Sequence, residues 1–286
     1  MSAPLRVGLS TCPNDTFAFH GLLCGAVQAR GLDLAFELAD VQALNEGLRQ
    51  GRFDAAKTSF AAALALSEEH VVLPAGSALG FGVGPVVLAA RPGPHPARPR
   101  VLCPGADTTA TLLWRLYHPG PADVRQVAFG EIMPALERGA ADLGVCIHEG
   151  RFTWQRRGLV LVEDLGERWE RDTGCPLPLG GVLARRALGA DVLARLAAAL
   201  RDSIRFGFEH RAAALATMRA HAREHDGDVL WKHVELYVSA ETLSLSSAGR
   251  AALARLARRA RQAGLAQAAA PDLEVAAFPE ELRAQA

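Results

Sequence analysis

The sequence predicts an α/β protein built as two lobes, with mostly parallel sheets, flanking helices and a ligand cleft between the lobes. Two observations support this fold class. Strand-like and helix-like segments alternate from the start of the chain, which favours parallel strands covered by helices. A segment with four prolines in ten residues, 91–100, then interrupts the alternation, and a second alternating series follows it.

The first series precedes the proline-rich segment and has three strand–helix pairs. Its expected strands are 5–9, 34–39 and 54–57, and its expected helices are 17–29, 41–50 and 58–67. Apolar residues alternate or run together in the strands, whereas they recur at helical spacing in the helices. The first helix follows a Pro-Asn-Asp-Thr turn. This order predicts a sheet with helices on both faces.

The second series ends in a long helical region. Its expected strands are 101–103, 124–128 and 142–147, with helices from residue 108 and over 131–138. The apolar run 85–90 and the segment 176–184 indicate two crossings between the lobes. From about residue 188 to 264 an alanine-rich helical pattern is expected to pack on the first lobe. We therefore predict a larger lobe of residues 1–88 and 184–286, with a smaller lobe, 89–183, inserted in it.

The composition argues against several classes of partner. The 286 residues have a formal net charge of zero and a pI of about 7.1, which favours neither nucleic acid nor an anionic membrane. The five cysteines contain no CxxC pair and are expected to be free thiols in a reducing compartment. Neither a signal peptide nor a transmembrane helix is expected. We predict a cytoplasmic protein with a small-molecule ligand, and a homodimer is one option for its assembly.

The best single indication of chemistry is His148, which ends the apolar run 143–147. Such a run predicts a buried strand, and open α/β sheets bind their ligands at the carboxyl ends of strands. A histidine kept neutral in a water-poor position can act as a base. A structural histidine that caps the next helix explains the position equally well, so both interpretations stay open here.

Three further loops follow predicted strands and are expected to face the cleft. In the loop 10–16, Asn14 and its neighbours can bind a ligand or cap a helix. In the second loop, Lys57, Thr58 and Ser59 are expected to bind a carboxylate, in preference to a solvated lysine or a Schiff base. In the third, Thr108 and Thr109 begin a helix and suit a carboxylate or a sugar hydroxyl. The third loop lacks the spacing of a Walker A motif.

The glycine-rich segment 76–85 does not have the spacing of a dinucleotide-binding motif, and it precedes a strand rather than a helix. Its glycines favour close approach of the backbone or bending at the lobe crossing.

Taken together, these loops resemble the 1,4-dihydroxy-6-naphthoate synthases of the futalosine pathway of menaquinone biosynthesis. The resemblance covers almost the whole chain. It rests on segments in the family's order, which are 10–17, 57–59, 80–85, 108–109, 147–153, 176–180 and 237–238. Gly150, where a serine is expected, and Thr11, where a proline is common, depart from the family pattern. Both are small changes beside the histidine.

The resemblance implies a periplasmic-binding-protein-like fold of type II and the conversion of cyclic dehypoxanthine futalosine to 1,4-dihydroxy-6-naphthoate without a cofactor or a metal. It implies that His148 is the proton acceptor. It also implies that Lys57, Thr58, Ser59, Thr108 and Thr109 bind substrate, and we add Asn14 and Gly82 to these substrate-binding candidates. Glu149 is adjacent to His148, but neighbouring side chains often diverge, so we assign it no role.

Three other classes are alternatives. A chorismate dehydratase of the same pathway has the same fold but does not require a base at His148. A protein that only binds a small carboxylate is the second; the expected absence of a signal peptide argues against a secreted solute-binding protein and leaves a cytoplasmic small-carboxylate binding protein. The effector domain of a regulator is the third, and no helix-turn-helix motif precedes Leu5.

Overall fold

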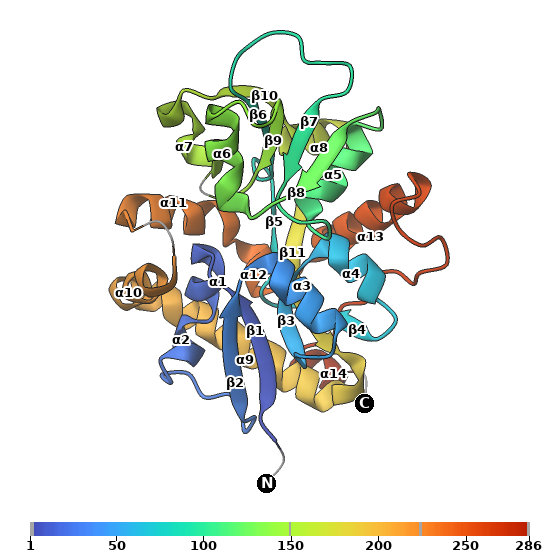
Figure 1. Ribbon diagram of the computed structural model, residues 1–286. Coiled ribbons are helices and arrows are strands. Elements are labelled where there is room, and N and C mark those ends of the chain that lie inside the picture. The colour runs from blue at the N-terminus through green and yellow to red at the C-terminus, as the bar shows by residue number, and fades with distance from the viewer. Residues whose placement is uncertain (1–2, 149, 223–224, 285–286) are drawn as a thin grey trace.

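The computed structural model describes residues 3–148, 150–222 and 225–284, which form two β-sheets flanked by helices (Figure 1). The first sheet has the order β2 (Leu34–Ala39), β1 (Leu5–Ser10), β3 (Ala55–Ser59), β11 (Leu177–Arg185) and β4 (His70–Val72), and β5 (Ala78–Gly80) also pairs with β11. The second has the order β10 (Val160–Asp164), β6 (Val86–Ala89), β9 (Leu143–Cys146), β7 (Arg100–Cys103) and β8 (Asp123–Gln126). The predicted α/β class with flanking helices is confirmed.

Both sheets are mixed, whereas the sequence predicted mostly parallel ones. Strand β1 runs parallel to β2 and β3, and β7 runs parallel to β8 and β9. In contrast, β11 is antiparallel to β3, β4 and β5, and β6 is antiparallel to β9 and β10. The reason is that β6 and β11 begin just after the chain passes from one sheet to the other. No βαβ crossover within a sheet obliges them to run parallel to their neighbours.

The two crossings fall close to the positions that the sequence indicated. Strand β6 lies in the second sheet and β11 lies in the first, so the chain changes sheets shortly before each of them. The division into a larger lobe, 1–88 and 184–286, and a smaller lobe, 89–183, stays a prediction, because membership of a sheet does not define an independent folding unit.

The helices of the first half alternate with the strands. They are α1 (Pro13–Ala18), α2 (His20–Leu23), α3 (Val41–Arg49), α4 (Phe60–Leu66), α5 (Thr109–Tyr117), α6 (Phe129–Glu137), α7 (Gly150–Thr153) and α8 (Leu165–Thr173), with a 3₁₀ turn at Trp154–Arg157. The expected helix 17–29 is wrong in detail. Pro13 already occupies the first turn of α1, and a break at Phe19 separates α1 from α2.

The second half is helical after β11, as expected. It contains a 3₁₀ turn at Arg186–Leu188 followed by α9 (Ala190–Glu209), α10 (Arg211–His221), α11 (Gly227–Tyr237), α12 (Ala240–Leu243), α13 (Ser247–Gln262) and α14 (Pro279–Ala284). Helices α9, α10 and α11 pack on α1 beside the first sheet, and α13 contacts both β11 of the first sheet and α5 beside the second. None of the described helices combines the length and the apolar character needed to cross a bilayer.

Local side-chain caps fix where several helices begin. The carboxylate of Asp40 accepts hydrogen bonds from the backbone N–H groups of Gln42 and Ala43 at the start of α3. The hydroxyl of Thr108 accepts one from the backbone N–H of Thr111 at the start of α5. Each cap satisfies N–H groups that have no partner inside the helix, which is worth about 1 kcal/mol.

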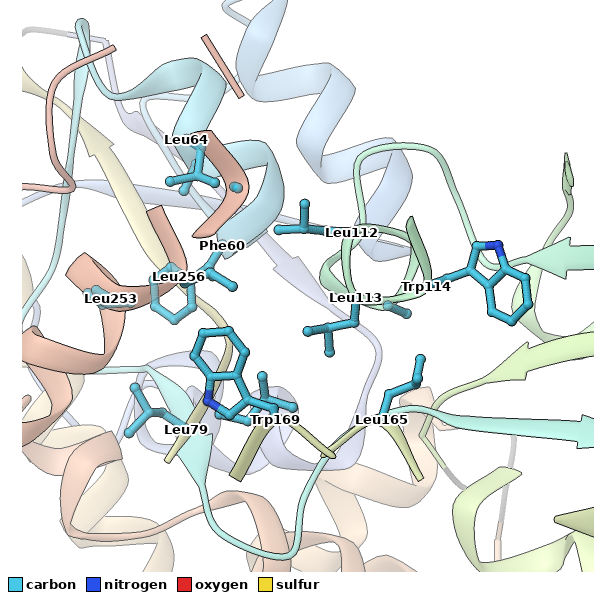
Figure 2. Packing of buried hydrophobic residues seen from close by; sticks show 14 of the residues in the cluster. Phe60, Leu64, Leu79, Leu112, Leu113, Trp114, Leu165, Trp169, Leu253 and Leu256 are labelled. Atoms are coloured by element: carbon cyan, nitrogen blue, oxygen red, sulfur yellow. The ribbon is translucent and has the colours of Figure 1, made fainter. Parts of the chain in front are cut away.

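One apolar cluster extends across both sheets (Figure 2). Phe60 of α4, Trp169 of α8 and Leu256 of α13 belong to it, and all three are fully buried. Figure 2 shows these side chains together with those of α5, including Leu112 and Leu113. Because side chains from both sheets share this cluster, burial of apolar surface couples the two sheets.

Candidate active site

A cavity lies between the two sheets, where several strands end. Its volume is about 100 Å³. Its polar lining residues are Ser10, Cys12, Asn14, Asp15, Lys57, Thr58, Ser59, Thr108, Thr109, His148, His233 and Tyr237. Every predicted site residue except Gly82 therefore lies at one cavity, although the segments that carry them are up to 134 residues apart (Asn14 to His148).

His148 lies two residues after the end of β9 and is half-buried at the cavity. Its backbone has φ of 55°, a left-handed conformation that few residues other than glycine adopt. The imidazole lies beside the thiol of Cys12, with Sγ at 3.4 Å from Nδ1 and 3.5 Å from Nε2, and packs edge-on to Phe129. The left-handed turn thus places a titratable ring at the end of a buried strand. Glu149, the next residue, lies outside the described residues.

Lys57 forms a buried ion pair with Asp15, and its Nζ lies 2.7 Å from Oδ1 of that carboxylate. Nζ also donates a hydrogen bond to the carbonyl oxygen of Gly76, at 3.0 Å. A lysine ammonium has three N–H donors, so these partners leave one for the cavity. Because Asp15 already balances the charge of Lys57, this geometry gives no support to Lys57 as the counterion of a substrate carboxylate. It leaves a neutral pair with one spare donor.

The backbone at the start of α5 offers donors to an anion. Among the described residues, the first two N–H groups of this helix, on Thr109 and Ala110, have no hydrogen-bond partner, and both residues line the cavity. The hydroxyls of Thr108 and Thr109 donate to the carbonyl oxygens of Gly105 and Leu179. They are therefore occupied as donors. An oxygen anion is favoured at such a helix N-terminus by both the free N–H groups and the helix dipole.

Thr58 and Ser59, the two remaining predicted residues of the cavity, lie at the end of β3. The hydroxyl of Thr58 donates to the carbonyl oxygen of Ala56. The backbone N–H of Ser59 donates to the side-chain oxygen of Asn45, and its hydroxyl makes no hydrogen bond within the described part of the chain. Ser59 is only 5% exposed, so its hydroxyl is a second donor available to a ligand in the cavity.

His233 was not predicted from the sequence, and α11 brings it to the cavity from the other half of the chain. Its Nε2 lies 2.9 Å from the side-chain oxygen of Asn14, 219 residues away. Burial lowers the pKa of His233 well below 6.5, and the proximity of His148 and Lys57 lowers it further. The one available signal was indirect, since Tyr237, which the family resemblance includes, lies one helical turn later on the same face.

Gly82 lies away from the cavity, and its predicted part in substrate binding finds no support in this position. Its N–H donates to a carboxylate oxygen of Glu170, and its carbonyl accepts from Arg151. Arg151 also donates to the carbonyl of Gly84 and forms an ion pair with Asp164 at 2.6 Å. The glycine two residues later, Gly84, lines the cavity instead. The reason is that the chain turns between them, with φ of 68° and 129°.

The cysteines are free thiols, as the sequence predicted. Burial raises the pKa of Cys103 and of Cys146 to about 12, so neither is a reactive thiolate at neutral pH. Within residues 3–148, 150–222 and 225–284, no three His, Cys, Asp or Glu side chains come together as metal ligands.

Comparison with known proteins agrees with this architecture. Residues 5–262 match the family model described as menaquinone biosynthesis. The chain is 44% identical over 262 residues to the 1,4-dihydroxy-6-naphthoate synthase of Thermus thermophilus, covering 92% of this chain and 96% of that one. It is 40% identical over 281 residues to the synthase of the same name from Streptomyces coelicolor, covering 96% and 98%.

Solved structures agree on the fold. Protein AF1704 from Archaeoglobus fulgidus superposes with a TM-score of 0.87 at 29% identity, covering 92% of this chain and 98% of that one. A Candida albicans protein with the generic periplasmic binding protein fold superposes with a TM-score of 0.65 at 11% identity, covering 92% and 91%. The expected periplasmic-binding-protein-like fold is therefore confirmed. With the family match spanning most of its length, this chain belongs to the menaquinone biosynthesis family.

Proposed function

We propose that this protein is a 1,4-dihydroxy-6-naphthoate synthase that converts cyclic dehypoxanthine futalosine, with His148 as the proton acceptor. The family and the names of its two relatives support the activity. The observation that carries the assignment of the base is the position of His148, at the end of β9 and on the wall of the cavity. Lys57 and Asp15 are paired with each other, and of the two imidazoles on the cavity wall His148 is the more exposed one, which makes it the candidate for proton transfer.

The substrate carboxylate is proposed to bind at the start of α5. The free N–H groups of Thr109 and Ala110 donate hydrogen bonds to it, and the hydroxyl of Ser59 or the remaining N–H donor of Lys57 can donate a further one. Several weak donors suit this task, because they orient a carboxylate without needing a further lysine or arginine in the wall.

Proton transfer then follows from the position of the base. Neutral His148 takes a proton from the bound substrate, and the electrons that this bond releases drive cleavage of a carbon–carbon bond. The sugar-derived fragment leaves, and the remaining ring becomes aromatic. No external oxidant is needed and no cofactor enters this scheme. A cavity between two sheets favours such chemistry, since it limits the access of water to the reacting atoms.

The test is to incubate purified protein with cyclic dehypoxanthine futalosine and to follow 1,4-dihydroxy-6-naphthoate by liquid chromatography and mass spectrometry. The wild type is expected to form product, and His148→Ala is expected to lose about 10²–10⁴-fold in rate. Its circular dichroism and its binding of substrate should be unchanged. Full activity in His148→Ala would refute His148 as the base.

The same experiment separates the alternatives. Absence of product with both chorismate and cyclic dehypoxanthine futalosine, although one of them binds, indicates a small-carboxylate binding protein. Dehydration of chorismate indicates the sister enzyme. We also propose that the protein acts in the cytoplasm on a small molecule. A homodimer stays a prediction, which light scattering after gel filtration tests directly.

A further inference from the structure

The side chain of His233 is almost fully buried, yet it lies on the cavity wall. It is 2% exposed and lies on α11, which packs on α1. Its ring centroid is 6.1 Å from that of His148, and the two rings are inclined by only 27°. Tyr237, one turn later, also packs against it, with the two ring centroids 4.6 Å apart. A second imidazole therefore lies 6.1 Å from the proposed base, measured between ring centroids.

The hydrogen bonds around Asp15 fix which nitrogen of His233 carries the proton. The Asp15 carboxylate can only accept, and its Oδ1 receives Nζ of Lys57 at 2.7 Å and Nδ2 of Asn14 at 2.8 Å. The amide of Asn14 is thereby oriented with its oxygen toward His233. That oxygen accepts from Nε2 of His233 at 2.9 Å, which requires a proton on Nε2.

The charge of His233 follows from its surroundings. Burial lowers its pKa well below 6.5, and the proximity of His148 and Lys57 acts in the same direction. At neutral pH the ring therefore holds one proton, on Nε2, and Nδ1 is a lone-pair acceptor. Among the described residues Nδ1 has no hydrogen-bond partner. Nδ1 is not one of the fully buried polar atoms that lack a partner, so it is open to the cavity, and a donor in the cavity can satisfy it.

We propose that His233 accepts a hydrogen bond through Nδ1 from a hydroxyl group of the substrate, and that Lys57, Asp15 and Asn14 hold it in the tautomer that permits this. The identity of the hydroxyl rests on the proposed function, whose substrate carries a polyhydroxylated, sugar-derived portion. Lys57 then contributes to substrate binding through this chain of hydrogen bonds, in addition to its spare donor. A ligand without a hydroxyl at this position is expected to bind more weakly.

The tautomer is tested without substrate, by NMR of protein labelled with ¹⁵N in histidine. The imidazole signals of His233 are those that disappear in His233→Gln. In the wild type they should show a protonated Nε2 and an unprotonated Nδ1 at pH 7. A protonated Nδ1, or a doubly protonated ring, overturns the proposal. This result does not depend on the reaction that the protein catalyses.

The substrate contact is tested by two variants that differ in which nitrogen they replace. Glutamine at position 233 can reach Asn14, as Nε2 does, but has no acceptor where Nδ1 lies; asparagine places its amide near Nδ1 but cannot reach Asn14. We expect His233→Gln to raise KM about 3- to 10-fold with kcat little changed, the size of one neutral hydrogen bond. His233→Asn should recover part of this loss.

A matched control comes from His20, which is also buried, at 3% exposed, but binds Thr217 on α10 away from the cavity. His20→Gln should leave KM unchanged. An unchanged KM in His233→Gln, or an equal rise in His20→Gln, overturns the substrate contact. If the wild type forms no product at all, the proposed function fails, and with it the hydroxyl contact to this substrate. The NMR result then still decides whether the tautomer is correct.

Discussion

Removing one partner of the buried ion pair between Lys57 and Asp15 is expected to destabilise the protein strongly, whereas removing both should cost much less. The perturbations are Lys57→Met, Asp15→Asn and the double variant. Both side chains are less than a tenth exposed, at 7% and 6%. Each single change leaves the other charge, or its hydrogen-bonding partners, buried without compensation.

The distance between the charges sets the size of the effect. At 2.7 Å the attraction is about 6 kcal/mol for an effective dielectric constant of about 20. Desolvation of two buried ions costs several kcal/mol each, so the intact pair contributes little net stability. A single removal instead leaves one desolvated ion, which costs roughly 3 kcal/mol, at the lower end of the usual range because both residues line the cavity and are not enclosed in the apolar core.

The assay is urea denaturation of the four proteins in a double-mutant cycle, followed by far-UV circular dichroism. We expect each single variant to lose roughly 3 kcal/mol and the double variant to lose no more than either single one. The coupling energy is then about 3 kcal/mol or more. Single losses below about 1 kcal/mol that simply add in the double variant would mean that the pair behaves as an exposed one, and the reasoning fails.

Three further predictions concern the turn at His148, the histidine on α11 and the glycines of the crossing. His148→Gly should be more stable to urea than His148→Ala, with a free energy of unfolding about 1 kcal/mol higher, because glycine adopts a φ of 55° without strain. Both variants should be inactive, and equal stabilities would contradict the presence of backbone strain at residue 148. The lowered pKa of His233 means that the unfolded chain binds its proton first as pH falls below about 6.5. The free energy of unfolding should therefore fall as the pH falls, with His233 contributing about 1.4 kcal/mol per pH unit. In urea titrations at several pH values, His233→Gln should make this dependence on pH less steep. An unchanged slope would count against the lowered pKa of His233. Gly84→Ala should lower the free energy of unfolding by about 2 kcal/mol or more, because the added Cβ would lie within 3 Å of Leu177 and of the Gly166 backbone. Gly82→Ala would place its Cβ in open space, so only backbone strain remains and the loss should be about 1 kcal/mol. Equal losses in thermal unfolding would show that backbone strain alone decides the cost.

Most of the candidate site was predictable because its residues lie next to short sequence patterns that mark the end of a strand or the start of a helix. His148 follows a continuous apolar run, and Thr108 caps a helix that begins after a strand and a glycine turn. Both patterns are contained in a few consecutive residues. Because strands in such folds deliver their carboxyl ends to one edge of a sheet, the sequence positions also predicted that these residues share a cavity.

The sequence alone could not identify Gly82 as lying outside the cavity. Gly80, Gly82 and Gly84 are equivalent as a pattern, and only the turn with φ of 68° and 129° separates the residue that faces Glu170 from the one on the cavity wall. The direction of β6 and β11 was unpredictable for a similar reason, since the hydrophobic pattern of a buried strand is the same in parallel and antiparallel pairing.

What the sequence by itself determined, then, is the α/β class, the two series of strands and helices, and the strand-end loops that carry His148, Lys57 and Thr109. The tertiary structure alone decided which of these side chains bind one another. It paired Lys57 with Asp15 and joined Asn14 to His233 across 219 residues. The physical reason is that caps, turns and periodicity act within a few residues, whereas the partner of a buried polar group depends on which distant segments the packing of the whole core brings into contact.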